Sequence, residues 1–159
     1  MKPVNASKVS YPNDSIVYAI GRLYVLLDSY LYNIAYKKHN LNSAKFNLLM
    51  AIKHIGKDKG ISQRELGNNL YVTAANITKL IDTLEKDALV LRMAFDRDRR
   101  INLIKITDKG SRLLDEIWPE HVTCVNGILD NFSASDKEKL NQLLEAFKKN
   151  MEEKQNEQR

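Results

Sequence analysis

The chain is poor in the residues and runs that mark several classes of protein. It has one cysteine, three prolines and six glycines among 159 residues. A single cysteine excludes an internal disulfide and fits a reducing compartment. No apolar run has the length of a membrane span, and residues 1–7 lack the apolar stretch of a signal peptide. We therefore expect a cytoplasmic protein without a membrane segment.

The sequence also offers little for catalysis. It has no glycine-rich phosphate loop, and its three histidines, His39, His54 and His121, lack the spacing of a metal pair. Cys124 lies in an apolar segment with helical spacing, which favours a small packed hydrophobic residue over a redox sensor. We expect no enzyme activity, no metal and no cofactor.

What the chain does have is enough apolar sequence for a core and an uneven distribution of charge. Hydrophobic residues make up 43% of the chain, and the net charge is +5. Between Arg92 and Lys105 basic residues exceed acidic ones by three, which indicates an anion-seeking segment. Lysines also exceed acidic residues between Lys37 and Arg64. A solvated helix face is the preferred interpretation of that second surplus, and a flank of the same anion track is the alternative.

Two short helices with a tight turn between them are predicted from residue 62 onward. Ser62 and Glu65 have the spacing of a capping box, followed by Leu66 and Leu70 at helical spacing. Thr73 is a good N-cap for the second helix. One face of that helix carries Ile77, Leu80, Ile81 and Leu84. This arrangement is a helix-turn-helix.

A β-hairpin is predicted after the second helix. Residues 90–95 (VLRMAF) and 101–106 (INLIKI) are rich in β-branched and large apolar residues, which is typical of strands. The charged segment 96–100 (DRDRR) is expected as the loop at the hairpin tip, where it meets solvent or a partner. Together these segments predict a winged helix-turn-helix.

These residues resemble the multiple antibiotic resistance regulator (MarR) family of bacterial transcription factors. The wing carries the D-x-R pattern of the family at Asp98 and Arg100, followed by Thr107 and by Lys109-Gly110 at the start of another helix. Upstream, the second helix of the family is similar to the segment that carries Leu41, Ser43, Phe46 and Leu49. The end of its recognition helix is similar to the segment that carries Leu84-Glu85, Leu89-Val90 and Arg92. Ala88 departs from the pattern, because the family usually has glycine there.

The resemblance implies a mainly α fold with a small β-wing and long terminal dimerisation helices. We expect residues 1–159 to form one such domain, with a winged helix-turn-helix lobe at 43–107 and dimerisation helices at 14–38 and 108–152. The implied function is that of a homodimeric repressor of pseudo-palindromic double-stranded DNA operators, released by a small aromatic or anionic effector. The alternative is a winged-helix module that binds protein without specific DNA binding, and RNA binding is weaker because no aromatic stacking platform accompanies the basic residues.

The expected DNA contacts lie at two helix starts and in the wing. Asn76 has the groups for bidentate readout of adenine, and Lys79 suits a guanine edge or a phosphate. Arg100 is the main candidate for a narrow minor groove, with Asp98 orienting its guanidinium. The full set is Ser62, Gln63, Thr73, Ala74, Ala75, Asn76, Thr78, Lys79, Arg92, Arg97, Asp98, Arg99 and Arg100.

The flanking segments are predicted to be helical. A first helix is expected to be capped within residues 13–15 and to end near Lys38, and a second to cover 43–54 and end at Gly56. Thr107 is expected to cap a fifth helix, which Pro119 should kink or break. Ser135 and Glu138 have the spacing of a capping box for a sixth helix, and the polar tail from residue 152 should fray.

Four aromatic residues are expected to line an effector site where the dimerisation helices meet the lobe. They are Tyr24, Tyr30, Phe46 and Trp118. Aromatic residues at helical spacing are more often part of the core, which is the alternative interpretation of these four. Oxidant-sensing relatives carry a cysteine early in the first helix, where this chain has valine and leucine, so oxidant sensing is not expected.

Overall fold

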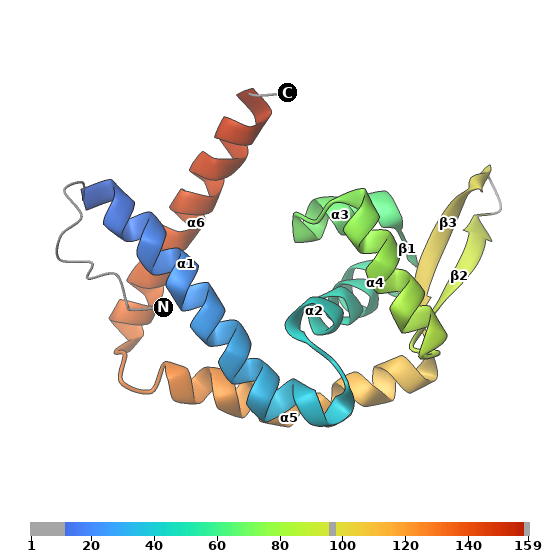
Figure 1. The fold of residues 1–159 in the computed structure, drawn as a ribbon, viewed down its shortest axis with the longest axis horizontal. Helices are drawn as coiled ribbons and strands as arrows, with labels where there is room; N and C mark the ends of the chain where they lie inside the picture. The colour runs from blue at the N-terminus through green and yellow to red at the C-terminus, as the bar shows by residue number, and fades with distance from the viewer. Residues whose placement is uncertain (1–11, 96–97, 158–159) are drawn as a thin grey trace, which may run out of the picture. The chain divides into compact units, whose positions relative to one another are not determined.

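The computed structural model describes residues 12–95 and 98–157 of the chain (Figure 1). It divides into two compact units, one through His121 and one from Val122, and each is described by itself. The α-helices are α1 Pro12–Leu31, α2 Ser43–Ala51, α3 Gln63–Leu70, α4 Ala74–Lys86, α5 Asp108–Ile128 and α6 Ala134–Glu157. The strands are β1 Ile61–Ser62, β2 Val90–Phe95 and β3 Asp98–Ile106. The short helical turns are η2 Tyr32–Tyr36, η3 Lys37–His39 and η4 Ile52–Gly56.

Helices α3 and α4 form the predicted helix-turn-helix. The Ser62 hydroxyl accepts from the Glu65 N–H, and the Glu65 carboxylate accepts from the Ser62 N–H at 3.0 Å, so the capping box is confirmed. The Thr73 hydroxyl caps α4 by accepting from the Asn76 N–H at 3.4 Å, as predicted. Three residues of the predicted inner face of α4, Ile77, Ile81 and Leu84, are fully buried, while the fourth, Leu80, is half-buried.

The wing is a twisted hairpin whose second strand begins earlier than predicted. Strand β2 pairs antiparallel with β3, in register Val90↔Ile106, and Phe95 pairs directly with Asp98. Residues 98–100 therefore lie in β3, and the prediction that they form a loop is wrong. The physical reason is that the β2–β3 pairing extends as far as Phe95 and Asp98, so residues 98–100 are part of the strand. Figure 1 shows the hairpin projecting beyond α4.

A third strand completes the sheet in the order β1-β3-β2. Strand β1 pairs antiparallel with β3 through Ile61↔Ile104 and Ser62↔Leu103. It was not predicted, because two residues are too few to display the alternating pattern of a strand. Since Ser62 is both a strand residue and the N-cap of α3, the wing and the start of the helix-turn-helix are joined directly.

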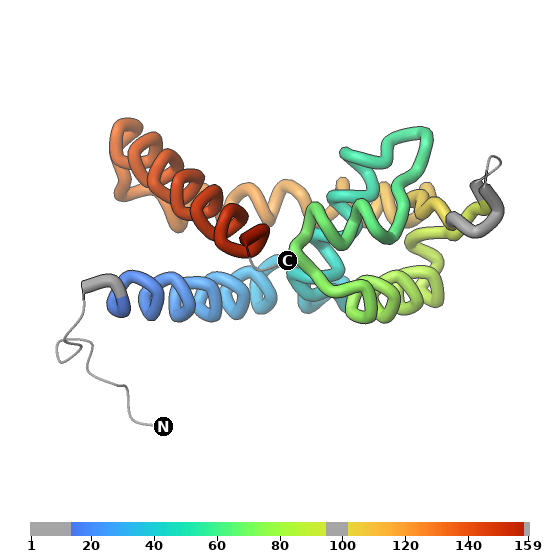
Figure 2. Tube along the Cα trace, turned by 90° about the horizontal axis from the view of Figure 1, so that it is seen from above, coloured from blue at the N-terminus to red at the C-terminus, as the bar shows by residue number. Residues whose placement is uncertain are grey.

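The first helix begins earlier than predicted. Helix α1 starts at Pro12, so residues 13–15 lie in its first turn and the predicted cap there is wrong. Proline is favoured in a first turn because the N–H that it lacks has no partner there anyway. The helical path continues through the π-turn η2 and the 3₁₀ turn η3, and ends at Asn40, which is left-handed. Helix α1 extends away from α2–α4 in both views (Figures 1 and 2).

Helices α2 and α5 precede and follow the helix-turn-helix and its wing along the chain. Asn42 caps α2, whose last turn widens into the π-turn η4 ending at the predicted Gly56. Thr107 caps α5, as predicted, by accepting from the Gly110 N–H at 3.0 Å. Helix α5 runs through Pro119 as one helix, so of the predicted kink or break the break is wrong and the kink stays a prediction. The buried Leu114 and Ile117 anchor the turn before the proline, and contacts of Glu120 and His121 anchor the turn after it.

The second unit consists of the end of α5 and the long helix α6. Ser133 caps α6 with Asp136, since its hydroxyl accepts from the Asp136 N–H at 3.1 Å. The predicted box of Ser135 and Glu138 is therefore wrong, because the same serine-and-acid spacing occurs two residues earlier. Helix α6 continues to Glu157, so residues 152–157 belong to the helix, and their fraying stays a prediction. Ion pairs such as Lys154–Glu157, at 2.8 Å, support this last turn.

Both terminal helices carry apolar side chains that are exposed in the single chain. On α6 these are Leu140, Leu143, Leu144, Phe147 and Met151. On α1 they are Ile16, Val17, Leu23, Tyr24, Val25, Leu26, Leu27 and Tyr30. On α6 they recur at helical spacing and form one stripe. Across 12–95 and 98–157, no helix combines the length and the apolarity that crossing a bilayer requires.

Candidate nucleic-acid interface

The start of α4 presents a small, polar and exposed face. Helix α4 buries Ile77, Ile81 and Leu84 on its opposite side, which fixes the direction of the remaining side chains. Six residues of the predicted DNA-contact set lie at this start and are exposed: Thr73, Ala74, Ala75, Asn76, Thr78 and Lys79. Small alanines allow close approach of another surface, while the helix N-terminus adds a partial positive charge.

Hydrogen bonds between α3 and α4 hold two of the predicted residues in place. The Gln63 amide donates from Nε2 to the Thr78 hydroxyl at 3.3 Å. The same hydroxyl donates to the Ala74 carbonyl at 2.9 Å. The Thr78 hydroxyl is therefore already hydrogen-bonded within the helix-turn-helix, and it fixes the direction of the Gln63 side chain at the start of α3.

Asn76 and Lys79 are the residues of this face that keep their side-chain groups available. Within the described part of the chain, neither the Asn76 amide nor the Lys79 ammonium makes a hydrogen bond or an ion pair. They are separated by three residues, so they lie on the same side of α4 about one turn apart. An amide with both donor and acceptor beside a cation is suited to the edges of bases and to phosphate.

Arg92 was expected to contact DNA, but in the structure its side chain is bound by carboxylates of α4. Its guanidinium forms ion pairs with Asp82 and Glu85 on α4. The Arg92 backbone N–H donates to Glu85 Oε1 at 3.1 Å. The side chain is only 22% exposed. Sequence reasoning missed this arrangement, although an arginine that follows two acidic residues of a helix end was a signal for it.

The remaining wing residues are placed only in part. Asp98, Arg99 and Arg100 belong to β3, so the basic segment follows a strand that pairs with β2. Arg97 lies outside the described residues.

Three of the six lysines between residues 37 and 64 form ion pairs with acidic residues of the same unit. Lys38 pairs with Glu120 at 2.6 Å, Lys45 with Asp87 at 3.7 Å, and Lys53 with Asp115 at 2.6 Å. About half of this positive charge is thus balanced within the module. Among residues 12–95 and 98–157, no group of three potential ligands is placed to hold a metal ion.

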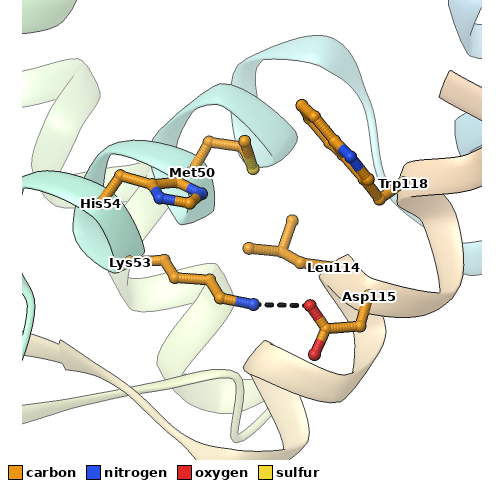
Figure 3. A pocket seen from close by; sticks show the side chains of 6 residues that line it. All are labelled: Met50, Lys53, His54, Leu114, Asp115 and Trp118. Carbon is orange, nitrogen blue, oxygen red and sulfur yellow. Dashed lines mark hydrogen bonds and ion pairs between the residues drawn. The ribbon is translucent and has the colours of Figure 1, made fainter. Parts of the chain in front are cut away.

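A pocket of about 260 Å³ lies between α2 and α5 (Figure 3). Figure 3 shows Met50, Lys53 and His54 on one wall and Leu114, Asp115 and Trp118 on the other, with Lys53 bonded to Asp115. Of the four predicted effector residues, only Trp118 lines this pocket. Its partners were missed, although Leu114 is four residues before Trp118 and so on the same face of the helix.

The other predicted aromatic residues lie elsewhere. Phe46 is 2% exposed and stacks on Tyr36, with ring centroids 4.7 Å apart. Tyr36 donates or accepts a hydrogen bond with His121 Nδ1 at 2.8 Å, and burial lowers the pKa of His121. Tyr24 and Tyr30 are exposed on α1. Cys124 is buried.

Two helices joined by a tight turn, followed by a hairpin whose strands pack beside the second helix, define a winged helix-turn-helix protein. A family model described as the MarR family matches residues 41–101. The HTH-type transcriptional regulator MhqR from Bacillus subtilis (strain 168) is 32% identical over 107 residues, which are 67% of this chain and 72% of that protein. The HTH-type transcriptional repressor YetL, also from Bacillus subtilis (strain 168), is 33% identical over 98 residues, which are 62% of this chain and 58% of that protein.

The fold agrees with these relatives. The solved structure of a MarR protein from Peptoclostridium difficile matches with a TM-score of 0.80 and 27% identity, and covers 97% of this chain and 96% of that one. The chain belongs to the MarR family of transcriptional regulators.

Proposed function

We propose that the chain is a sequence-specific regulator that binds double-stranded DNA through its lobe at residues 43–107. The observation that carries this proposal is the exposed start of α4, where Asn76 and Lys79 have uncommitted side-chain groups beside a basic wing. An α-helix fits the major groove of B-DNA, and in this proposal the wing would reach the neighbouring minor groove. Arg99 and Arg100 would supply positive charge there.

A second part of the proposal is that the protein acts as a homodimer. The apolar stripe of α6 contains Leu143 at 60% exposure and Leu144 at 48%, and a chain in water gains free energy by covering such a stripe. Helices at 14–38 and 108–152 would form the dimer. A two-fold dimer with one lobe in each subunit binds half-sites about one helical turn, roughly 34 Å, apart. Such a complex covers promoter DNA and supports repression.

The proposal extends to a small effector in the pocket between α2 and α5. Met50, Leu114 and Trp118 supply apolar surface, and Lys53 supplies a cation that now pairs with Asp115 at 2.6 Å. A cavity of about 260 Å³ is smaller than the range typical of drug-sized ligands, roughly 300–1,000 Å³, so a single aromatic ring with a carboxylate is the best fit. Such an anion would stack on Trp118 and compete with Asp115 for Lys53.

Selection of bound duplexes from a random pool tests the DNA-binding proposal. We expect enrichment of an inverted repeat, with an affinity that falls steeply as salt rises, because neutralised phosphates release counterions. If no duplex sequence is enriched, and if the protein instead captures a protein partner at an affinity that does not depend on salt, the interaction-module alternative is favoured.

The single tryptophan makes the effector proposal testable by fluorescence. Benzoate as a probe should change the emission of Trp118 and weaken duplex binding. The Lys53→Gln variant should lose the response to benzoate, whereas Lys57→Gln, on an exposed lysine outside the pocket, should keep it. A response that is unchanged in Lys53→Gln would remove Lys53 from the site.

A further inference from the structure

Arg92 is the third residue of β2 and connects the wing to α4 through both its side chain and its backbone. The guanidinium binds the carboxylates of Asp82 and Glu85, and the Arg92 N–H donates to Glu85 Oε1 at 3.1 Å. We call Arg92, Asp82 and Glu85 the Arg92 clasp. Asp82 and Glu85 are three residues apart, so they lie on one face of α4 and receive the arginine together.

The clasp fixes the position of an edge strand. Strand β2 lies at the edge of the sheet, because the order of strands is β1-β3-β2. The Glu85 carboxylate accepts from a backbone N–H of this strand and also pairs with the guanidinium of the same residue. The Glu85 carboxylate therefore holds both the backbone and the side chain of Arg92, and this restrains the position and the orientation of β2 relative to α4. A planar guanidinium that bridges two carboxylates adds directional restraint that a lysine ammonium would lack.

The charge of the clasp argues against direct binding of phosphate by Arg92. One cation is surrounded by two carboxylates, so the cluster carries a net negative charge. For Arg92 to reach DNA, it would have to leave both carboxylates, and these would then remain near the phosphates without a partner. The guanidinium is 22% exposed, and the carboxylates of Asp82 and Glu85 are 58% and 38% exposed, so the Arg92–Glu85 pair is the better shielded of the two.

We propose that Arg92 is a positioning residue, and that its clasp with Asp82 and Glu85 sets the spacing between α4 and the wing so that both engage one duplex together. Lys79 lies three residues before Asp82, so the clasp holds the wing to the same helix that presents Asn76 and Lys79. This inference rests on the proposed DNA binding. Without the clasp, each element would still contact DNA, but not both in register.

Neutralising the carboxylates distinguishes positioning from direct contact by the sign of the effect. If Arg92 contacted DNA, Asp82→Asn or Glu85→Gln would free the cation and remove repulsion, and binding to the selected duplex would tighten. If the clasp positions the wing, both changes weaken binding although they remove negative charge. Asp58→Asn is the matched control, because Asp58 is an exposed carboxylate of the same lobe outside the clasp. The control reports the effect of one lost negative charge.

A double-mutant cycle with the wing provides the second readout. Arg92→Ala should weaken binding on the order of tenfold in the wild-type background and have little effect in an Arg100→Ala background, because positioning matters only when the wing contributes. Arg92→Lys should not restore binding. Losses that multiply independently in the double variant, or tighter binding by Asp82→Asn, would overturn the positioning role while leaving DNA binding intact. Absence of duplex binding by the wild-type protein would instead overturn the proposed function and this inference with it.

Discussion

Replacement of Ala88 by glycine should stabilise the protein. Ala88 follows the C-cap of α4 and has a φ of 57°, a left-handed conformation in which a Cβ clashes with the following carbonyl group. That conformation costs a residue with a side chain about 1–2 kcal/mol. Glycine removes this cost but gives the unfolded chain more freedom, which offsets about 0.4–1 kcal/mol. Ala88 is exposed, so loss of its methyl group sacrifices little packing.

The net gain is therefore ~0.5–1 kcal/mol, because the backbone bonds of Ala88 are kept. Its N–H donates to the Glu85 carbonyl at 2.9 Å, and its carbonyl accepts from the Thr107 hydroxyl at 2.8 Å. For a chain of this size the gain corresponds to a rise in Tm of ~1–4 °C. Scanning calorimetry at fixed protein concentration measures it. Ala44→Gly, on an exposed right-handed position of α2, is the control and should lower Tm. An equal loss in both variants would refute the reasoning.

Three further changes test other parts of the structure. Gly110→Ala should cost ~1–3 kcal/mol in denaturant unfolding, since its Cβ would lie 2.2 Å from the Leu89 carbonyl oxygen, and stability within ~0.5 kcal/mol of wild type would contradict that close approach. Because burial lowers the pKa of His121, the folded state binds fewer protons than the unfolded state near that pKa. The stability of the protein should therefore be unaffected by His121 above about pH 6.5 and should decline below it. The decline in Tm from about pH 7.5 to about pH 5.5 should be smaller in the His121→Gln variant. A decline of the same size in that variant would exclude His121 as its source. Leu143→Asp should yield monomers in sedimentation, because burial of an unpaired carboxylate costs several kcal/mol, whereas Gln142→Asp, on the opposite face of α6, should remain dimeric; dimers in both variants would exclude this stripe from the interface.

The sequence was most informative where a structure depends on neighbours along the chain. The Ser62–Glu65 capping box, the Thr73 cap and the inner face of α4 are set by residues within two helical turns of one another. The same is true of the Thr107 cap of α5. Hydrogen bonds and burial that recur at helical spacing leave a pattern that can be read without coordinates.

Features that depend on distant segments were missed. Strand β1 exists because β3 offers it a partner, and its two residues carry no pattern of their own. The Arg92 clasp joins residues only seven and ten positions apart, but it forms between a helix and a strand, so no single periodicity displays it. The pocket joins Lys53 to Asp115 across 62 positions in sequence, so only the packing of α2 on α5 brings them together.

Two local predictions were also wrong, each for a local reason. The α6 cap was assigned to Ser135, but Ser133 has the same spacing to an acidic residue and begins the helix earlier. The start of α1 was placed at polar residues after Pro12, although proline itself is favoured in the first turn.

The most direct measurement of the central claim is the affinity of the Asn76→Ala variant for the selected duplex and for its single-base variants. Asn76 is exposed at the start of α4, and within the described residues its side chain makes no hydrogen bond. If α4 reads bases, this change should cost ~1–3 kcal/mol on the preferred duplex and relax preference at one base pair, while the preference at other positions remains. Equal weakening on every duplex, or unchanged affinity on all of them, would contradict base readout by this helix.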